Sequence, residues 1–198
     1  MYKYIILNIL VIIFIFLIVY IFLKKSKSEA IYSKSDVTNK EYLVQNLENK
    51  EEATHILGII DARILILRNY LEKNINKYPD YKPYINQFCN RIKNLKLYEN
   101  APDGKYTSFT VNKGDEIALC LRSKKTKKLH DLNLVMYVVL HELAHVACPE
   151  VDHTELFKKI FIFLLNISIE IHIYSYDNYQ AMPKEYCGLT IDENLLNH

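Results

Sequence analysis

Five consecutive residues, His141-Glu-Leu-Ala-His145, hold the most recognisable chemistry in this sequence. Residues four apart lie on the same face of a helix, so the imidazoles of His141 and His145 can bind one metal ion. Glu142 stands beside that pair, where its carboxylate can accept a proton from a metal-bound water molecule. The spacing therefore predicts a zinc site on a helix, with Glu142 as the general acid and base of a peptidase.

A catalytic zinc site needs a third protein ligand and keeps a fourth position open for water. We favour His153, because it supplies another imidazole after a short segment that reverses direction at Pro149. A thiolate from Cys148 would instead favour a closed, structural site. The carboxylates that remain as alternatives are Glu170, Asp152 and, less favourably, Glu150.

The elements that must position these side chains can be predicted from the surrounding pattern. We expect a helix over Leu132–Cys148, with Asp131 as its N-cap and Pro149 as its stop. Before it, Glu116–Arg122 alternates apolar and polar residues as a strand does. After it, we expect a core helix from Thr154 to about Ile171, whose apolar run is too short to span a membrane.

The preceding part of the chain predicts further helices and one more strand. We expect a buried helix over His55–Tyr70 and a second over Lys82–Leu95, opened by Pro83. Tyr106–Val111 is predicted as a strand, followed by a turn at 112–114. Together these elements predict an α+β domain, with helices packed on a short sheet and the metal motif on the central helix.

The amino-terminal residues differ in character from the rest. Tyr4–Leu23 is twenty residues long, apolar and without charge, which predicts a single transmembrane helix. Lys24, Lys25 and Lys27 follow it, so the positive-inside rule places the domain in the cytosol or inside a viral envelope. The polar residues 24–49 are expected to be a juxtamembrane tether. The predicted organisation is an anchor over 1–23, a tether over 24–49 and a metal-dependent peptidase domain over 50–198.

Charge and cysteine usage limit the expected partners. The chain of 198 residues has 25 basic and 23 acidic residues, so it has no overall nucleic-acid signature. The basic segment 122–128 is expected to be a solvated loop. The four cysteines lack any C-x-x-C spacing, and in a cytosolic domain we expect them to be reduced and mostly packed. In the reversed membrane orientation they could form two disulfides. The expected partners are therefore a protein substrate and a membrane.

The order of these features resembles that of the WLM and SprT-like metallopeptidases. The resemblance rests on the strand Glu116–Arg122, the His-Glu-Leu-Ala-His helix, and His153-Thr-Glu-Leu-Phe157 at the start of the next helix. Small metallopeptidase-like proteins of large DNA viruses are more similar still, since they share a segment like Glu185–Thr190. The resemblance implies a zincin fold, with His141, His145 and His153 as zinc ligands and Glu142 as the catalytic acid and base. The seven residues between His145 and His153 exceed the five usual in WLM domains.

The expected function is that of a membrane-anchored, zinc-dependent endopeptidase. Such a reaction needs a hydrogen-bond donor for the developing oxyanion, and Tyr186, Tyr179 and His172 are candidates. The strand Glu116–Arg122 could bind an extended substrate by edge addition. Two alternatives remain open: a non-catalytic, metal-stabilised interaction domain at a membrane, and a WLM- or SprT-like protease that acts on DNA-linked proteins.

Overall fold

The computed structural model describes residues 8–18, 30–101, 104, 106–193 and 195–196. Residues 8–18 are helical, whereas the remainder of the predicted span Tyr4–Leu23 lies outside the described residues. Among the described residues, no helix has both the length and the apolar character needed to cross a bilayer. The transmembrane anchor therefore stays a prediction.

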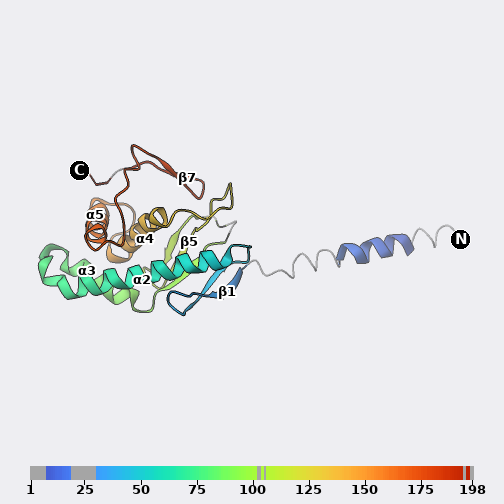
Figure 1. The fold of residues 1–198 in the computed structure, drawn as a ribbon, viewed down its shortest axis with the longest axis horizontal. Coiled ribbons are helices and arrows are strands. Elements are labelled where there is room, and N and C mark those ends of the chain that lie inside the picture. Colours follow the sequence, from blue (N-terminus) through green and yellow to red (C-terminus); the bar gives the residue numbers. More distant parts are fainter. Residues whose placement is uncertain (1–7, 19–29, 102–103, 105, 194, 197–198) are drawn as a thin grey trace.

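A mixed five-stranded sheet lies at the centre of the domain (Figure 1). Its strands follow the order β1-β2-β3-β5-β4. The inner strands β2, β3 and β5 are parallel to one another, and the outer strands β1 and β4 are antiparallel to their neighbours. The bounds are Ala30–Lys34 for β1, Glu41–Gln45 for β2, Lys96–Glu99 for β3, Phe109–Val111 for β4 and Glu116–Leu119 for β5.

The interpretation of residues 24–49 as a tether is wrong for residues 30–45. These residues form the hairpin β1–β2 at one edge of the sheet, while 24–29 lie outside the described residues. Tyr42 and Val44 are buried in alternation with more exposed neighbours, which is the period-two pattern of a strand. Edge strands tolerate charged and polar residues, so their sequence signal is weak. The folded domain includes Ala30 and does not start near Lys50.

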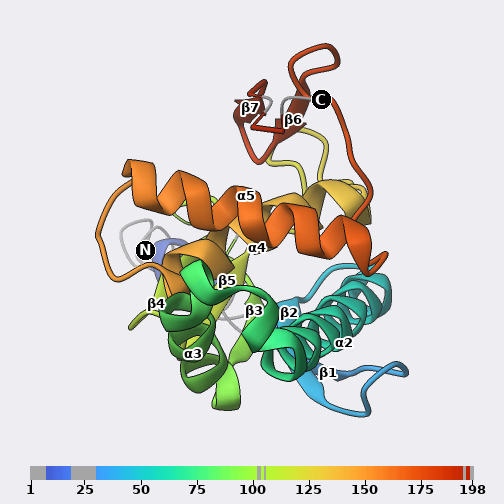
Figure 2. The same ribbon diagram turned by 90° about the vertical axis from the view of Figure 1, so that its left-hand side faces the viewer.

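Four long helices pack with the sheet into an α+β domain, as predicted. Helix α4 lies in the middle of the helical layer, in contact with α5 on one side and α3 on another, and Figure 2 shows α5 running along α4. Their bounds are Lys50–Asn74 for α2, Lys82–Arg91 for α3, Leu132–Ala147 for α4 and Glu155–Glu170 for α5, with short 3₁₀ turns at Ile75–Lys77, Pro79–Tyr81 and Ile92–Asn94. Most of α4 is buried, so the metal motif sits in the core.

A second, two-stranded sheet follows α5 near the carboxyl terminus. Strands β6 (Lys184–Tyr186) and β7 (Leu189–Ile191) pair antiparallel and are separate from the main sheet. They were not predicted, nor was β3. Strands of three or four residues have too few alternating positions for a reliable pattern, and they depend on tertiary contacts for stability.

Candidate metal centre

Side chains at both ends of helix α4 fix its position. At the start, the Asp131 carboxylate accepts hydrogen bonds from the backbone amides of Asn133 and Leu134, at 3.0 and 3.1 Å. At the end, Arg91 of α3 donates to the carbonyl of Val146 at 2.9 Å. These contacts satisfy backbone groups that a helix leaves unpaired at its ends. The predicted N-cap and the predicted stop before Pro149 are confirmed.

The segment after α4 carries His153 back towards the helix. Lys113 donates to the carbonyl of Pro149 at 2.9 Å, which ties the start of this segment to the turn after β4. Asp152 has a φ of 68°, a left-handed conformation that reverses the chain. Thr154 then caps α5 by accepting the backbone N–H of Phe157 at 3.2 Å. His153 is thus held between a reversal and a helix cap.

Three imidazoles converge at this point. The Nε2 atoms of His141 and His145 are 3.2 Å apart, those of His145 and His153 are 3.1 Å apart, and those of His153 and His141 are 3.0 Å apart. Three nitrogen ligands of a tetrahedral zinc ion, each about 2.0–2.1 Å from the metal, lie about 3.3 Å from one another. The donor set therefore fits one Zn²⁺ ion, with a fourth position left for water or substrate.

Burial keeps the imidazoles of His141 and His145 in the neutral form that binds a metal. Burial, followed by repulsion from the neighbouring histidines, lowers the pKa of His141 to about 3. Burial also lowers the pKa of His145 to about 4. The ring of Phe157 lies 5.0, 4.2 and 4.8 Å from the rings of His141, His145 and His153, respectively. Neutral imidazole is the species that coordinates zinc, and one aromatic wall orients all three rings.

The alternative ligands lie elsewhere or have other partners. Glu170 accepts a hydrogen bond of 2.6 Å from the hydroxyl of Tyr70, and Glu150 accepts one from Thr154. Cys148 is a fully buried free thiol, and Asp152 is exposed. Within the described part of the chain, the three histidines are the one group of potential ligands whose donor atoms all lie within 4.8 Å of one another.

Glu142 is buried beside the imidazoles and has one hydrogen-bond donor. The hydroxyl of Thr110, on strand β4, donates to its Oε2 atom at 2.9 Å. Burial raises the pKa of Glu142 to about 7, and the bond from Thr110 opposes that rise. A carboxylate that titrates near pH 7 is well matched to accepting and returning a proton. Thr110 was not predicted as a site residue, because its contact with Glu142 joins positions 32 residues apart.

A cavity of about 420 Å³ opens beside His141, Glu142 and His153. Its floor is helix α4, with Tyr137, Val138, His141 and Glu142. One side is formed by Thr107 and Ser108, which precede β4, and another by the β6–β7 hairpin and the two acidic residues that follow it. The lining from this carboxyl-terminal part is Tyr186, Leu189, Thr190, Ile191, Asp192 and Glu193. The cavity is large enough for a few side chains of a peptide.

The three candidate oxyanion donors differ in their position. Tyr186 lines the cavity, and its hydroxyl lies 2.7 Å from that of Ser108. Tyr179 is buried and packs edge-on against the ring of Tyr137, behind the cavity floor. His172 lies beyond the end of α5 and lines a different surface depression, with Arg63. Only Tyr186, of these three, stands at the site.

The strand predicted to bind a substrate by edge addition is not at an edge of the sheet. Strand β5 lies between β3 and β4, so both its edges are hydrogen-bonded, and its regular part ends at Leu119. The outer strand on that side of the sheet is β4. The turn 112–114 reverses the chain between the two strands, with Gly114 at a φ of 127°. Both strands were predicted, but their spatial order, which decides the edge of the sheet, depends on tertiary packing.

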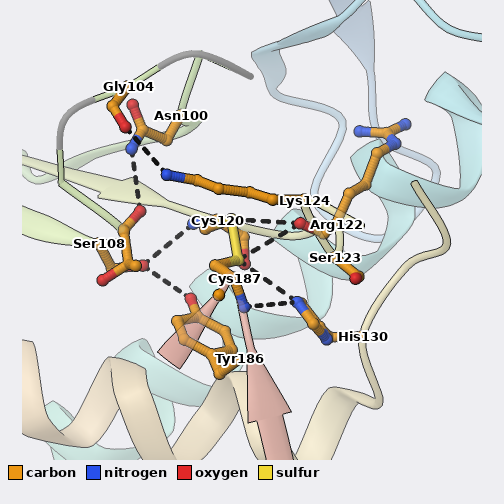
Figure 3. Close-up of a disulfide and its surroundings, with 12 residues drawn as sticks. Asn100, Gly104, Ser108, Cys120, Arg122, Ser123, Lys124, His130, Tyr186 and Cys187 are labelled. Carbon is orange, nitrogen blue, oxygen red and sulfur yellow. Dashed lines mark hydrogen bonds between the residues drawn. A yellow bond between two sulfur atoms is a disulfide. The ribbon is translucent and has the colours of Figure 1, made fainter. Parts of the chain in front are cut away.

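The expectation that all four cysteines are reduced is wrong for two of them. Cys120, which directly follows β5, forms a disulfide with Cys187 in the turn between β6 and β7 (Figure 3). Cys89 and Cys148 are free and buried. The pairing joins residues 67 apart in sequence, and spacing alone cannot reveal such a partner.

The basic segment 122–128 is not uniformly solvated. Arg122 is buried and forms an ion pair with the buried carboxylate of Glu99, and it also donates to the side chain of Asn49 at 2.9 Å. Lys124 donates to the carbonyl of Gly104 at 3.0 Å. The remaining lysines of the segment are exposed. The prediction of a solvated loop therefore holds for the exposed lysines and fails for Arg122.

Comparison with known proteins assigns the chain to a protein family. The WLM domain model matches residues 88–179, a range that contains the three histidines and Glu142. An uncharacterised protein, R325, of Acanthamoeba polyphaga mimivirus is 70% identical over 99% of this chain and 100% of its own length. This chain belongs to the WLM family. Uncharacterised protein 136R of Invertebrate iridescent virus 6 is 29% identical over 78% of this chain and 85% of its own length.

Solved structures give a more distant likeness to this WLM protein. The crystal structure of Wss1 from Saccharomyces cerevisiae has a TM-score of 0.49 and 23% identity, covering 66% of this chain and 88% of that one. A Wss1 mutant has a TM-score of 0.48 at the same identity, covering 66% of this chain and 92% of that one. The resemblance to WLM proteins, and to uncharacterised viral proteins, is thus confirmed at the level of sequence.

Proposed function

We propose that this WLM-family chain is a zinc-dependent endopeptidase. The observation that carries the proposal is the convergence of three imidazole Nε2 atoms, 3.0–3.2 Å apart, beside a buried carboxylate in an open cavity. His141, His145 and His153 would hold the metal, and their mutual spacing fits zinc. When bound, Zn²⁺ acidifies a water molecule and polarises a peptide carbonyl.

Glu142 supplies the proton transfers of the proposed reaction. Its carboxylate accepts the proton of the attacking water, and it then returns that proton to the leaving amine. Burial favours both steps, because it raises the pKa of the carboxyl to about 7 and brings its acid and base forms close in free energy. The hydroxyl of Thr110 keeps the carboxylate oriented and limits the rise in the pKa of Glu142.

The substrate we propose is an extended peptide segment laid along strand β4. This strand is the outer strand next to the site, and Thr107 and Ser108 just before it line the cavity. Backbone pairing with a sheet edge binds peptides independently of their sequence, while the cavity accepts individual side chains. Tyr186, which lines the cavity next to Ser108, is the residue we propose as donor to the oxyanion.

We also propose that the amino-terminal segment attaches this peptidase to a membrane. The support is the uncharged sequence Tyr4–Leu23, and within it the large apolar side chains of 9–18 are all about half exposed or more. Flotation with lipid vesicles of the full chain, against a chain that starts at residue 30, tests this point. Equal recovery of both chains in the lipid fraction would contradict it.

Replacement of Glu142 by Gln tests the peptidase proposal. The amide preserves shape but cannot accept the proton, so kcat for a quenched peptide library should fall by about 100-fold or more. Zinc content, measured by atomic absorption, should stay at that of the wild-type chain. Undiminished cleavage by the Glu142→Gln variant, or no cleavage by the zinc-loaded wild type, would refute the proposal.

A further inference from the structure

The β6–β7 hairpin is a small element attached to the domain through its turn. Its two strands have three residues each, and they pair only with each other among the described residues. Cys187 and Gly188 form the turn, with φ of 52° and 91°. Two consecutive positive φ values characterise the tight hairpin turns that match strand twist. An isolated hairpin of this size is unstable in water, so its position must come from contacts with the domain.

Those contacts gather around one covalent bond. The disulfide joins the turn residue Cys187 to Cys120 at the end of β5, and the backbone N–H of Cys187 points at Nε2 of His130, 3.3 Å away (Figure 3). The rings of His130 and Tyr186 lie 5.0 Å apart. The disulfide to Cys120 and the contacts of Cys187 and Tyr186 with His130 therefore attach the hairpin to the domain at its turn.

Ser108 connects this attachment to the adjoining side of the cavity, which is formed by the segment before β4. Its Oγ accepts the backbone N–H of Cys120 at 3.0 Å and lies 2.7 Å from the hydroxyl of Tyr186. Figure 3 shows these bonds meeting next to the disulfide. Ser108 and Tyr186 both line the cavity. The hydrogen bonds next to the disulfide therefore join the side formed by residues 107–108 to the side formed by the hairpin.

The hairpin and the two residues after it contribute a large part of the cavity lining. Six of the thirteen residues that line the cavity come from the segment 186–193. By contrast, the three imidazoles and Glu142 come from α4 and from the segment just before α5. Displacing the hairpin would therefore remove much of the substrate-binding surface without moving the metal ligands.

We propose that Cys120 and Cys187 are positioning residues whose disulfide holds the β6–β7 hairpin as one side of the active-site cavity. Oxidation of the two thiols releases two electrons and two protons to a disulfide oxidant, which becomes a dithiol. Reduction reverses this step, lets the hairpin leave the cavity, and weakens peptide binding while the zinc site persists. The effect on peptide hydrolysis rests on the proposed peptidase function, whereas the effect on the hairpin does not.

The zinc-loaded full chain provides the test. A phosphine reduces the bond: the two sulfurs gain two electrons, two protons come from solvent, and the phosphine becomes its oxide with oxygen from water. Alkylation in denaturant should find two free thiols before reduction and four after it, as the pairing requires. Amide hydrogen exchange over 184–191 should accelerate about tenfold or more on reduction. KM for peptides should rise about tenfold, and kcat should also fall because Tyr186 leaves the site with the hairpin, while the zinc content stays unchanged.

Matched variants separate this role from general stability. Cys89→Ala/Cys148→Ala keeps the disulfide and should respond to the phosphine as the wild type does. Cys120→Ala/Cys187→Ala should show the raised KM and fast exchange without phosphine, and no further change with it. Four free thiols before reduction, or unchanged exchange at 184–191 after reduction, would overturn the proposal. If no peptide is hydrolysed in any state, the peptidase proposal fails, and thiol counts with hydrogen exchange still decide the role of the disulfide.

Discussion

The hydroxyl of Thr110 donates a hydrogen bond of 2.9 Å to the carboxylate of Glu142, and so joins the outer strand β4 to helix α4, which carries His141 and His145. Thr110 lies in the strand that we propose as the substrate edge, and Glu142 is the proposed proton carrier. The bond therefore couples the element that would bind the peptide backbone to the group that would transfer its proton. A charge-assisted bond of this kind also fixes a carboxylate in a single orientation.

Replacement of Thr110 by Val should lower peptide hydrolysis at neutral pH by about tenfold, because a hydrogen bond to a charged group contributes about 1.5 kcal/mol. The bond favours the ionised form, so its loss raises the pKa of Glu142 further above its usual range. The acidic limb of the kcat/KM profile should consequently move to higher pH. Thr110→Ser retains the hydroxyl and should restore both values, which a pH–rate profile of each variant measures. An unshifted acidic limb in Thr110→Val would contradict the assigned role.

Replacement of His153 by Ala should release zinc, because two imidazoles remain of the three that converge. We expect less than about a tenth of an equivalent of zinc to survive dialysis against a weak chelator. Glu170→Ala is the matched control, since Glu170 is bonded to Tyr70 and should leave the zinc content at the wild-type level. Metal analysis of both variants shows whether His153 or Glu170 supplies the third ligand. Full occupancy in His153→Ala would show that another residue supplies the third ligand.

Reduction of the Cys120–Cys187 disulfide should lower the free energy of unfolding by about 4 kcal/mol, since it removes a constraint on a long loop of the unfolded chain. For a domain of this size the urea midpoint should then fall by about 2 M. Urea titrations with and without a phosphine, followed by circular dichroism, measure the shift. Cys120→Ala/Cys187→Ala should already have the lower midpoint, and any further fall on adding phosphine would count against this explanation.

Breaking the buried pair between Arg122 and Glu99 should destabilise the domain by about 3–5 kcal/mol. Arg122→Met keeps much of the side-chain volume but leaves the Glu99 carboxylate buried without its cation. Lys125→Met, in the same basic segment, is exposed and should change the free energy of unfolding by less than about 0.5 kcal/mol. Urea unfolding compares the two variants, and equal effects would mean that Arg122 acts only as one of several surface charges.

The local part of this site could be predicted from the amino-acid sequence. The His141 and His145 spacing, the Asp131 cap and the Pro149 stop all act within one or two helical turns, where helix geometry relates sequence directly to position. Those features predicted helix α4 and two converging imidazoles. The apolar pattern also predicted α5, because sixteen residues of core helix leave a clear periodic signal.

The rest of the cavity is assembled by long-range packing, which the sequence pattern did not predict. It brought His153, rather than Glu170, next to the other imidazoles, and it placed Thr110 on the sheet edge beside Glu142. It also paired Cys120 with Cys187 and thereby turned an unpredicted hairpin into one side of the cavity. These contacts join residues from 8 to 67 positions apart. They depend on how whole elements pack, and no short-range spacing in the chain records that packing.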